Sequence, residues 1–236
     1  MIKAVLFDLD GTLLPMDQKT FVNAYLDTMT KALAPHGYDP ELLARTIWKS
    51  IGIMARNEGH KTNEEVFWEF FCGVFGEKAR QDEPVFDQYY HNEFQQVRHS
   101  CGYTPRAVQC VREIRDMGFR TVLATNPMFP AIATQSRVRW AGLEPEDFEF
   151  ITTYEGWGHS KPNSAYFADI LNKMGLTPQE AIMVGNDAHE DGCAKEVGME
   201  VFLLTHDLIN KFNRNITDWP QGDFDDLMTY VRRLNK

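Results

Sequence analysis

The chain has 236 residues, of which 43% are hydrophobic, and it carries a formal net charge of −10. This composition is typical of a folded protein with a substantial buried core. Lysine and arginine do not form an acid-free basic run, and no apolar run approaches the ~20 residues of a membrane helix. We therefore expect neither nucleic acid nor a membrane as a partner.

The four cysteines include no C-x-x-C pair, and the first residues enter a strand pattern without a signal region. Unpaired thiols are typical of a reducing compartment. We therefore expect a cytoplasmic location.

The first predicted strand is the short apolar run at residues 4–7, which is typical of a strand buried on both faces of a parallel sheet. From about residue 17 to residue 100 the apolar residues instead recur at helical spacing. Asp39-Pro40 predicts a helix start, Thr62 to Glu65 predicts a capping box, and Phe86 to Val97 predicts a fourth helix.

From about residue 105 the chain alternates between helices and buried strands. The expected helices run through Val111 to Gly118 and over residues 129–141, 164–174 and 189–197; the expected strands cover 121–124, 150–151, 181–184 and 201–204. This alternation predicts right-handed crossovers and a parallel sheet. The fold class is therefore α/β: a doubly wound, Rossmann-like core of residues 1–15 and 101–236, with an all-α cap inserted at residues 16–100.

Reactive and polar side chains follow four of the predicted strands. They are Asp8 and Asp10 after the first strand, Thr125-Asn126 after the second, Lys161 in the loop after the third, and Asn186-Asp187 with Asp191 after the fourth. Ligands of such sheets bind beyond the carboxyl ends of the strands. We therefore expect these side chains to share one site.

The chemistry of such a group can be worked out from its charges. Carboxylates held close together repel one another, and Mg²⁺ with oxygen ligands relieves this repulsion. Asp8 is the candidate nucleophile, Asp10 the acid and base, and Lys161 the cation that holds a phosphoryl group. The candidate metal ligands are Asp8, Asp10 and Asp187, and the candidate substrate-binding residues are Thr12, Thr125, Asn126 and Lys161.

These motifs resemble those of the haloacid dehalogenase-like hydrolase superfamily. Phe7-Asp8-Leu9-Asp10-Gly11-Thr12-Leu13 is similar to its first motif, Thr125 to the second, Lys161 to the third, and Gly185-Asn186-Asp187 with Asp191 to the acidic fourth. The resemblance implies that Asp8 is nucleophile and metal ligand and that Asp10 is the acid and base, with its backbone carbonyl on Mg²⁺. It also implies that the helical insertion is the cap.

The chain departs from the family pattern at Asn186, where many members have aspartate. Asp187 is our expected direct ligand, Asn186 is a possible neutral ligand, and Asp191 is expected to act through water or outside the direct ligands. An acid at Asp10 favours phosphate esters over halides. We therefore expect a phosphatase that acts on a small phosphorylated metabolite. A sugar phosphomutase of the β-phosphoglucomutase type and a catalytically silent ligand-binding relative are the alternatives.

Overall fold

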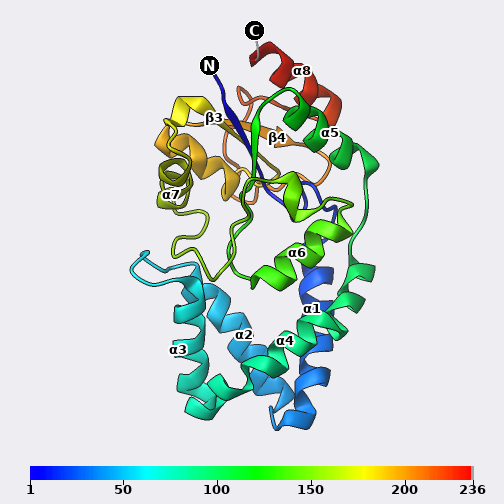
Figure 1. Cartoon of the computed structure of the whole chain (residues 1–236), viewed down its shortest axis with the longest axis vertical. Helices are drawn as coiled ribbons and strands as arrows, with labels where there is room; N and C mark the ends of the chain where they lie inside the picture. Colours follow the sequence, from blue (N-terminus) through cyan, green and yellow to red (C-terminus); the bar gives the residue numbers. More distant parts are fainter. Residues whose placement is uncertain (235–236) are drawn as a thin grey trace.

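The computed structural model describes residues 1–234, and its centre is a parallel sheet of five strands in the order β2-β1-β3-β4-β5 (Figure 1). The strands are β1 (Ala4–Phe7), β2 (Arg120–Leu123), β3 (Ala181–Gly185), β4 (Glu200–Leu204) and β5 (Gln221–Gly222). Phe7 pairs with Leu123 on one side and with Val184 on the other, so three strands end at the same level. The predicted fold class is confirmed.

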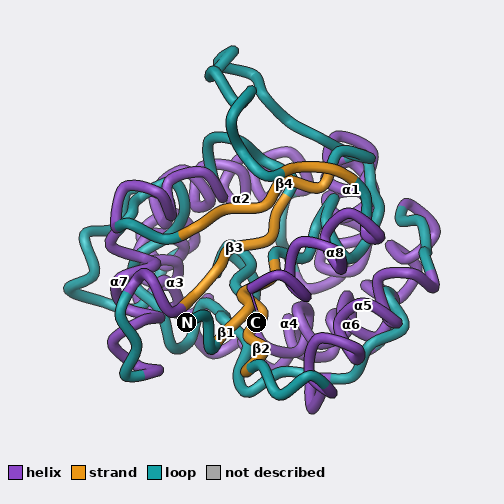
Figure 2. The backbone as a smooth tube through the Cα atoms, turned by 90° about the horizontal axis from the view of Figure 1, so that it is seen from above, coloured by secondary structure: helices purple, strands orange, loops and turns teal. Residues whose placement is uncertain are grey.

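Alternating residues of the strands face two different helical layers. Val5 and Phe7 belong to a core shared with α5 (Pro105–Asp116) and α8 (Phe224–Leu234). Ala4 and Leu6 belong to a core shared with α7 (Ala165–Met174). Figure 2 shows these helices on opposite sides of the strands. The continuous apolar run in β1 is thus explained by burial on both faces.

Helices alone are assigned between Gln18 and Ser100, and they form a layer beyond the carboxyl ends of the strands (Figure 1). They are α1 (Gln18–Leu33), α2 (Pro40–Met54), α3 (Asn63–Phe75), α4 (Glu83–His91) and the 3₁₀ segments η1 (Ala34–His36), η2 (Glu77–Asp82) and η3 (Glu93–Ser100). Asp39 caps α2, and Thr62 forms a complete capping box with Glu65. Both helix starts predicted from the sequence are confirmed.

The remaining elements surround the sheet. They are α6 (Ala131–Trp140) and the 3₁₀ segments η4 (Pro145–Asp147), η5 (Pro178–Glu180) and η6 (Asp191–Val197). Within residues 1–234 no helix is both long and apolar enough to cross a membrane.

Three predicted elements differ from the structure. The helix expected through Phe86 to Val97 is interrupted at Asn92, whose φ of −112° and ψ of −82° are not helical, and it continues only as a 3₁₀ segment. The strand expected at 150–151 is only an isolated bridge between Ile151 and Leu123, made by the Leu123 N–H on the Phe150 carbonyl and the Thr152 N–H on the Leu123 carbonyl. The helix expected over 189–197 is the 3₁₀ segment η6, since a turn capped by a side chain occupies the residues before it.

The two chain segments that enter and leave the helical layer run side by side. Met16 and Cys101 form an antiparallel bridge, and the Gly102 N–H donates to the Pro15 carbonyl over 2.7 Å. The helical layer is thus joined to the sheet by one paired crossing.

Asn63 provides a second connection between the helical layer and the sheet. Its fully buried side chain donates to the Pro127 carbonyl (3.0 Å) and to Ser160 Oγ (2.9 Å), and it accepts from Asn57 (2.9 Å). Pro127 and Ser160 each adjoin a predicted site residue, so this contact links the start of α3 to the loops of the candidate site.

We expect Asn63→Ala to lower the free energy of unfolding by about 1–3 kcal/mol, because it leaves buried polar groups without partners. Urea unfolding measures the change. Asn172→Ala on the exposed surface of α7 is the control, with an expected effect within about 0.5 kcal/mol. Equal effects of the two substitutions would contradict the structural role of Asn63.

Candidate active site

Asp8 lies directly after β1, where its backbone N–H donates to the Val184 carbonyl over 2.9 Å. Its side chain is nearly buried, and each carboxylate oxygen has a different partner. Lys161 Nζ donates to Oδ1 over 2.8 Å, and the Thr12 hydroxyl donates to Oδ2 over 3.1 Å. The candidate nucleophile therefore has a cation on one oxygen and a neutral donor on the other.

Lys161 is shared between two carboxylates. Its ammonium lies 2.7 Å from Asp191 Oδ1 as well as 2.8 Å from Asp8, and its side chain is only 2% exposed. Burial disfavours the charged ammonium, but the two carboxylates outweigh it and raise the pKa of Lys161 well above its usual range. Lys161 therefore remains a cation at the centre of the site.

The loops that carry Thr125 and Lys161 are tied together by Asn126. The Asn126 side chain accepts from the Lys161 N–H (3.0 Å) and donates to the Lys161 carbonyl (3.2 Å) and to Glu190 (3.0 Å). The Thr125 carbonyl accepts from Thr152 (2.6 Å). The structure thus places the Asn126 side chain on the backbone that positions Lys161.

The side chain of Asp10 has a different partner from those of Asp8 and Asp191. Its Oδ2 forms an ion pair with Nη1 of Arg137, a side chain of α6 that is 1% exposed. Loss of water around Asp10 raises the pKa of its carboxyl above the usual value, and the guanidinium partly opposes this shift. The sequence analysis did not identify Arg137. The available signal was an arginine on the helix face shared with buried Ala133 and Ala141, where the pattern calls for an apolar residue.

Asn186 occupies the position where the family pattern often has an acid. Its Oδ1 accepts from the Thr12 hydroxyl (3.1 Å), and its Nδ2 donates to the Asp207 carbonyl (2.7 Å). Gly11, with a φ of +83°, lies against this amide, and a Cβ at Gly11 would overlap it. A carboxylate at position 186 would face the Asp207 carbonyl without a proton to donate, which accounts for the amide.

Asp187 and Asp191, the two acids of the fourth motif, differ in how many hydrogen bonds their carboxylate oxygens accept. Asp191 Oδ1 accepts from Lys161, and its Oδ2 accepts from the N–H groups of Asn186 (3.0 Å) and Asp187 (2.9 Å). Asp187 Oδ1 accepts from the N–H groups of His189 and Glu190, and its second oxygen has no hydrogen bond among the described residues. Asp187 and Asn186 therefore have oxygens available to a metal. A metal at Asp191 would compete with three hydrogen bonds, from the Lys161 ammonium and two backbone N–H groups.

The oxygens around Thr12 fit a divalent cation. No three His, Cys, Asp or Glu side chains in residues 1–234 form a metal site by themselves. However, the single hydroxyl proton of Thr12 faces two acceptors, Asp8 Oδ2 and Asn186 Oδ1, so their lone pairs exceed the available donors. Mg²⁺ needs only one or two carboxylates and keeps several water ligands. Asp8, Asn186 and Asp187 could therefore hold it.

An open cleft of about 900 Å³ reaches the site between the helical layer and the sheet. Gly11 and Asn186 line its inner end, and Lys19, Asn23 and the 59% exposed Trp48 line the helical side. The cleft thus meets the site at Asn186, whose Oδ1 shares the Thr12 hydroxyl with Asp8.

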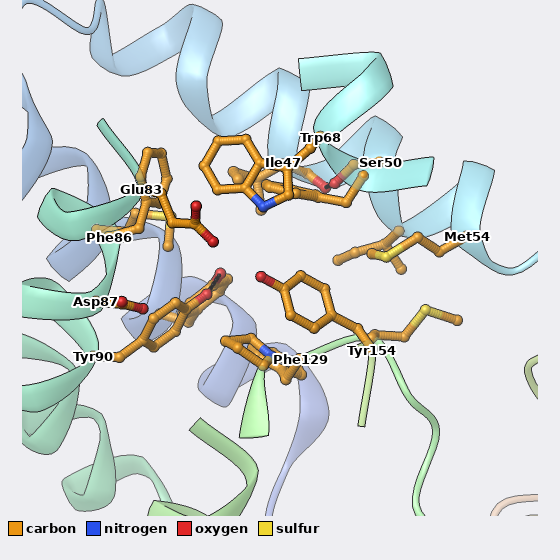
Figure 3. Close-up of a pocket in the computed structure, with 16 residues that line it drawn as sticks. Ile47, Ser50, Met54, Trp68, Glu83, Phe86, Asp87, Tyr90, Phe129 and Tyr154 are labelled. Carbon is orange, nitrogen blue, oxygen red and sulfur yellow. Dashed lines mark hydrogen bonds between the residues drawn. The ribbon is translucent and has the colours of Figure 1, made fainter. Parts of the chain in front are cut away.

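A second, smaller space of about 40 Å³ lies between the helical layer and the loops after β2 and before α7 (Figure 3). Trp68, Phe129 and Tyr154 surround it, and the buried Trp68 Nε1 has no hydrogen-bond partner within residues 1–234. Its lining contains none of the predicted site residues. The Phe129 ring, however, also lies against the Arg137 guanidinium, at 4.4 Å.

A sequence model described as haloacid dehalogenase-like hydrolase matches residues 2–198. A glyceraldehyde 3-phosphate phosphatase of Methanopyrus kandleri is 24% identical over 100% of both chains. A phosphoglycolate phosphatase of Vibrio vulnificus is 25% identical over 87% of this chain and 84% of its own length. The structure is similar to that of a 2-haloacid dehalogenase from Pseudomonas syringae, with a TM-score of 0.65, 21% identity and coverage of 99% and 100%. This last similarity shows the fold alone.

We expect Asn186→Asp to lower the free energy of unfolding by about 1–3 kcal/mol in the absence of divalent cations. The substitution removes the donor to the Asp207 carbonyl and adds a negative charge near Asp8. Urea unfolding in a chelator measures the loss, and the same measurement in Mg²⁺ should recover part of it. A variant as stable as the parent protein in the chelator would contradict this account of the amide.

Proposed function

Because the chain belongs to the haloacid dehalogenase-like hydrolase family, we propose that it is a magnesium-dependent phosphomonoester hydrolase with an aspartyl-phosphate intermediate on Asp8. The family predicted from the motifs is confirmed. The phosphatase class agrees with the two curated relatives, both of which are named as phosphatases.

The observation that carries this proposal is the arrangement around Asp8. The carboxylate is nearly buried at the end of β1, and Lys161 is fixed beside it by Asp191. A phosphoryl group that reaches Asp8 meets this fixed cation, which lowers the cost of bringing one anion to another. Attack by an Asp8 oxygen forms the new O–P bond as the bond to the leaving alcohol breaks, and water later displaces Asp8 from phosphorus.

The other predicted residues take roles around this step. Asp10 protonates the leaving oxygen and later takes a proton from the attacking water. Thr125 and Lys161 bind the phosphoryl oxygens. Thr12 and Asn126 lie close enough to contribute to substrate binding, and their present contacts hold Asp8 and the Lys161 loop in place.

We assign the Mg²⁺ site to the Asp8 carboxylate, the Asp10 backbone carbonyl and Asp187, with Asn186 as a further oxygen ligand. The carboxylate of Asp10 is excluded from this set by its ion pair with Arg137. Bound Mg²⁺ would neutralise part of the negative charge shared by Asp8 and the substrate phosphate.

We further assign residues 16–100 to a cap and residues 1–15 with 101–236 to the core. The paired crossing at Met16 and Cys101 supports these boundaries. The open cleft between the two parts would admit a small phosphorylated metabolite, such as the three-carbon or two-carbon phosphates for which the relatives are named. The cytoplasmic location stays a prediction.

We expect Asp8→Asn to reduce the hydrolysis of 4-nitrophenyl phosphate with Mg²⁺ to background, because the amide cannot form the acyl phosphate. Phosphate release measures the activity. Asp27→Asn, an exposed acid on α1, is the control and should keep the parent rate. Full activity of Asp8→Asn would contradict the proposed mechanism.

Removal of divalent cations with a chelator should abolish hydrolysis, and Mg²⁺ should restore it. Asp187→Ala should raise the Mg²⁺ concentration that gives half of the maximal rate, since it removes an anionic ligand. Asp116→Ala, an exposed acid at the end of α5 on the side of the sheet where β2 begins, should leave that concentration unchanged. Parent-like activation of Asp187→Ala would remove Asp187 from the metal site.

A further inference from the structure

Arg137 is a buried cation that has no role in the proposed mechanism so far. Its guanidinium packs against the rings of Phe129 at 4.4 Å and Phe21 at 5.9 Å, and Nη1 pairs with Asp10 Oδ2. Phe129 belongs to the loop after β2 and Phe21 to α1. Arg137 is therefore enclosed between the sheet and the helical layer, away from the cluster at Asp8.

A role in stability alone poorly explains why Arg137 and Asp10 form a buried ion pair. Both charges lose their hydration, and replacing a buried pair by apolar groups is often neutral or stabilising. The second contact of the guanidinium is a long one, from Nη2 to the Thr134 hydroxyl at 3.4 Å, and Nε has no partner among the described residues. The interaction with Asp10 is thus the main polar contact that fixes Arg137.

The two oxygens of Asp10 are unequal as a result. Oδ2 accepts from Arg137, whereas the buried Oδ1 has no donor within the described part of the chain. The lone pairs of Oδ2 face a cation, so a proton on this carboxyl belongs on Oδ1. A bound substrate or water would provide the polar partner that Oδ1 lacks.

On the basis of the proposed function, we propose that Arg137 is a positioning residue that holds Asp10 by Oδ2, so that Oδ1 exchanges the proton. In the first step Asp8 forms its bond to phosphorus, the ester P–O bond breaks, and the proton on Oδ1 moves to the leaving oxygen. In the second step water attacks phosphorus, its proton returns to Oδ1, and the bond from phosphorus to Asp8 breaks. Protons and electron pairs balance over the cycle.

The test uses two substrates of nearly equal shape, phenyl phosphate and 4-nitrophenyl phosphate. Phenolate needs a proton as it leaves, whereas the more acidic 4-nitrophenol needs much less help. Loss of the positioned acid should therefore reduce kcat/KM for phenyl phosphate more than for 4-nitrophenyl phosphate. The ratio of the two constants on one preparation cancels the folded fraction, so a partly unfolded variant still gives a valid result.

We expect Arg137→Gln to change this ratio by at least about tenfold, in the same direction as Asp10→Asn, given the usual contribution of a general acid. Arg137→Lys should recover part of the change because it keeps a cation. In the Asp10→Asn background, Arg137→Gln should add little, since both substitutions remove one function. Arg139→Gln, from an exposed arginine on the same helix, is the control and should leave the ratio unchanged.

The outcomes separate this inference from the proposed function. If Arg137→Gln lowers both constants equally, or changes neither, while Asp8→Asn abolishes turnover, the positioning role is wrong and the mechanism at Asp8 stands. If neither substrate is hydrolysed, or if Asp8→Asn remains active, the proposed function itself fails.

Discussion

The ammonium of Lys161, shared between Asp8 and Asp191, is the interaction on which the rest of the site depends. Without a cation at this point, two nearly buried carboxylates would face one another across the end of the sheet. With it, one ammonium donates to both carboxylates and holds Asp8 at the carboxyl end of β1. Asp191 meanwhile uses its other oxygen to hold the backbone of Asn186 and Asp187. The same contact therefore fixes the candidate nucleophile and the candidate metal loop.

Hydrogen bonds of two buried or partly buried amides connect Lys161 to the helical layer. Asn126 holds the Lys161 backbone, and Asn63 links the neighbouring Pro127 and Ser160 to the start of α3. Each of these amides satisfies several backbone or side-chain groups at once, so the loops are held without a further layer of regular structure. The position of the helical layer is thereby coupled to the loops of the candidate site.

Much of the candidate site was predictable from the sequence, because ligands of parallel sheets bind beyond the carboxyl ends of the strands. Asp8, Thr125 and Asn186 follow strands that the structure places side by side, and Lys161 reaches the same edge from a loop. The contact between Asp10 and Arg137 was not predictable, because it depends on how α6 is rotated against the sheet. The break at Asn92 was also missed, since the apolar spacing continues through it while the backbone leaves the helix.

The two aspartates of the first motif show how neighbouring carboxylates acquire different roles. Asp8 lies among Lys161, Thr12 and the oxygens of the fourth motif, so that an ammonium and a hydroxyl donate to its carboxylate. Asp10 lies where loss of water raises the pKa of its carboxyl, and one of its oxygens is held by Arg137. Acid–base catalysis requires such a separation, because one carboxylate must remain charged while the other gains and loses a proton. In this chain the separation follows from geometry: Asp8, directly after β1, contacts Lys161 and Thr12, whereas Asp10, two residues further on, contacts Arg137 of α6.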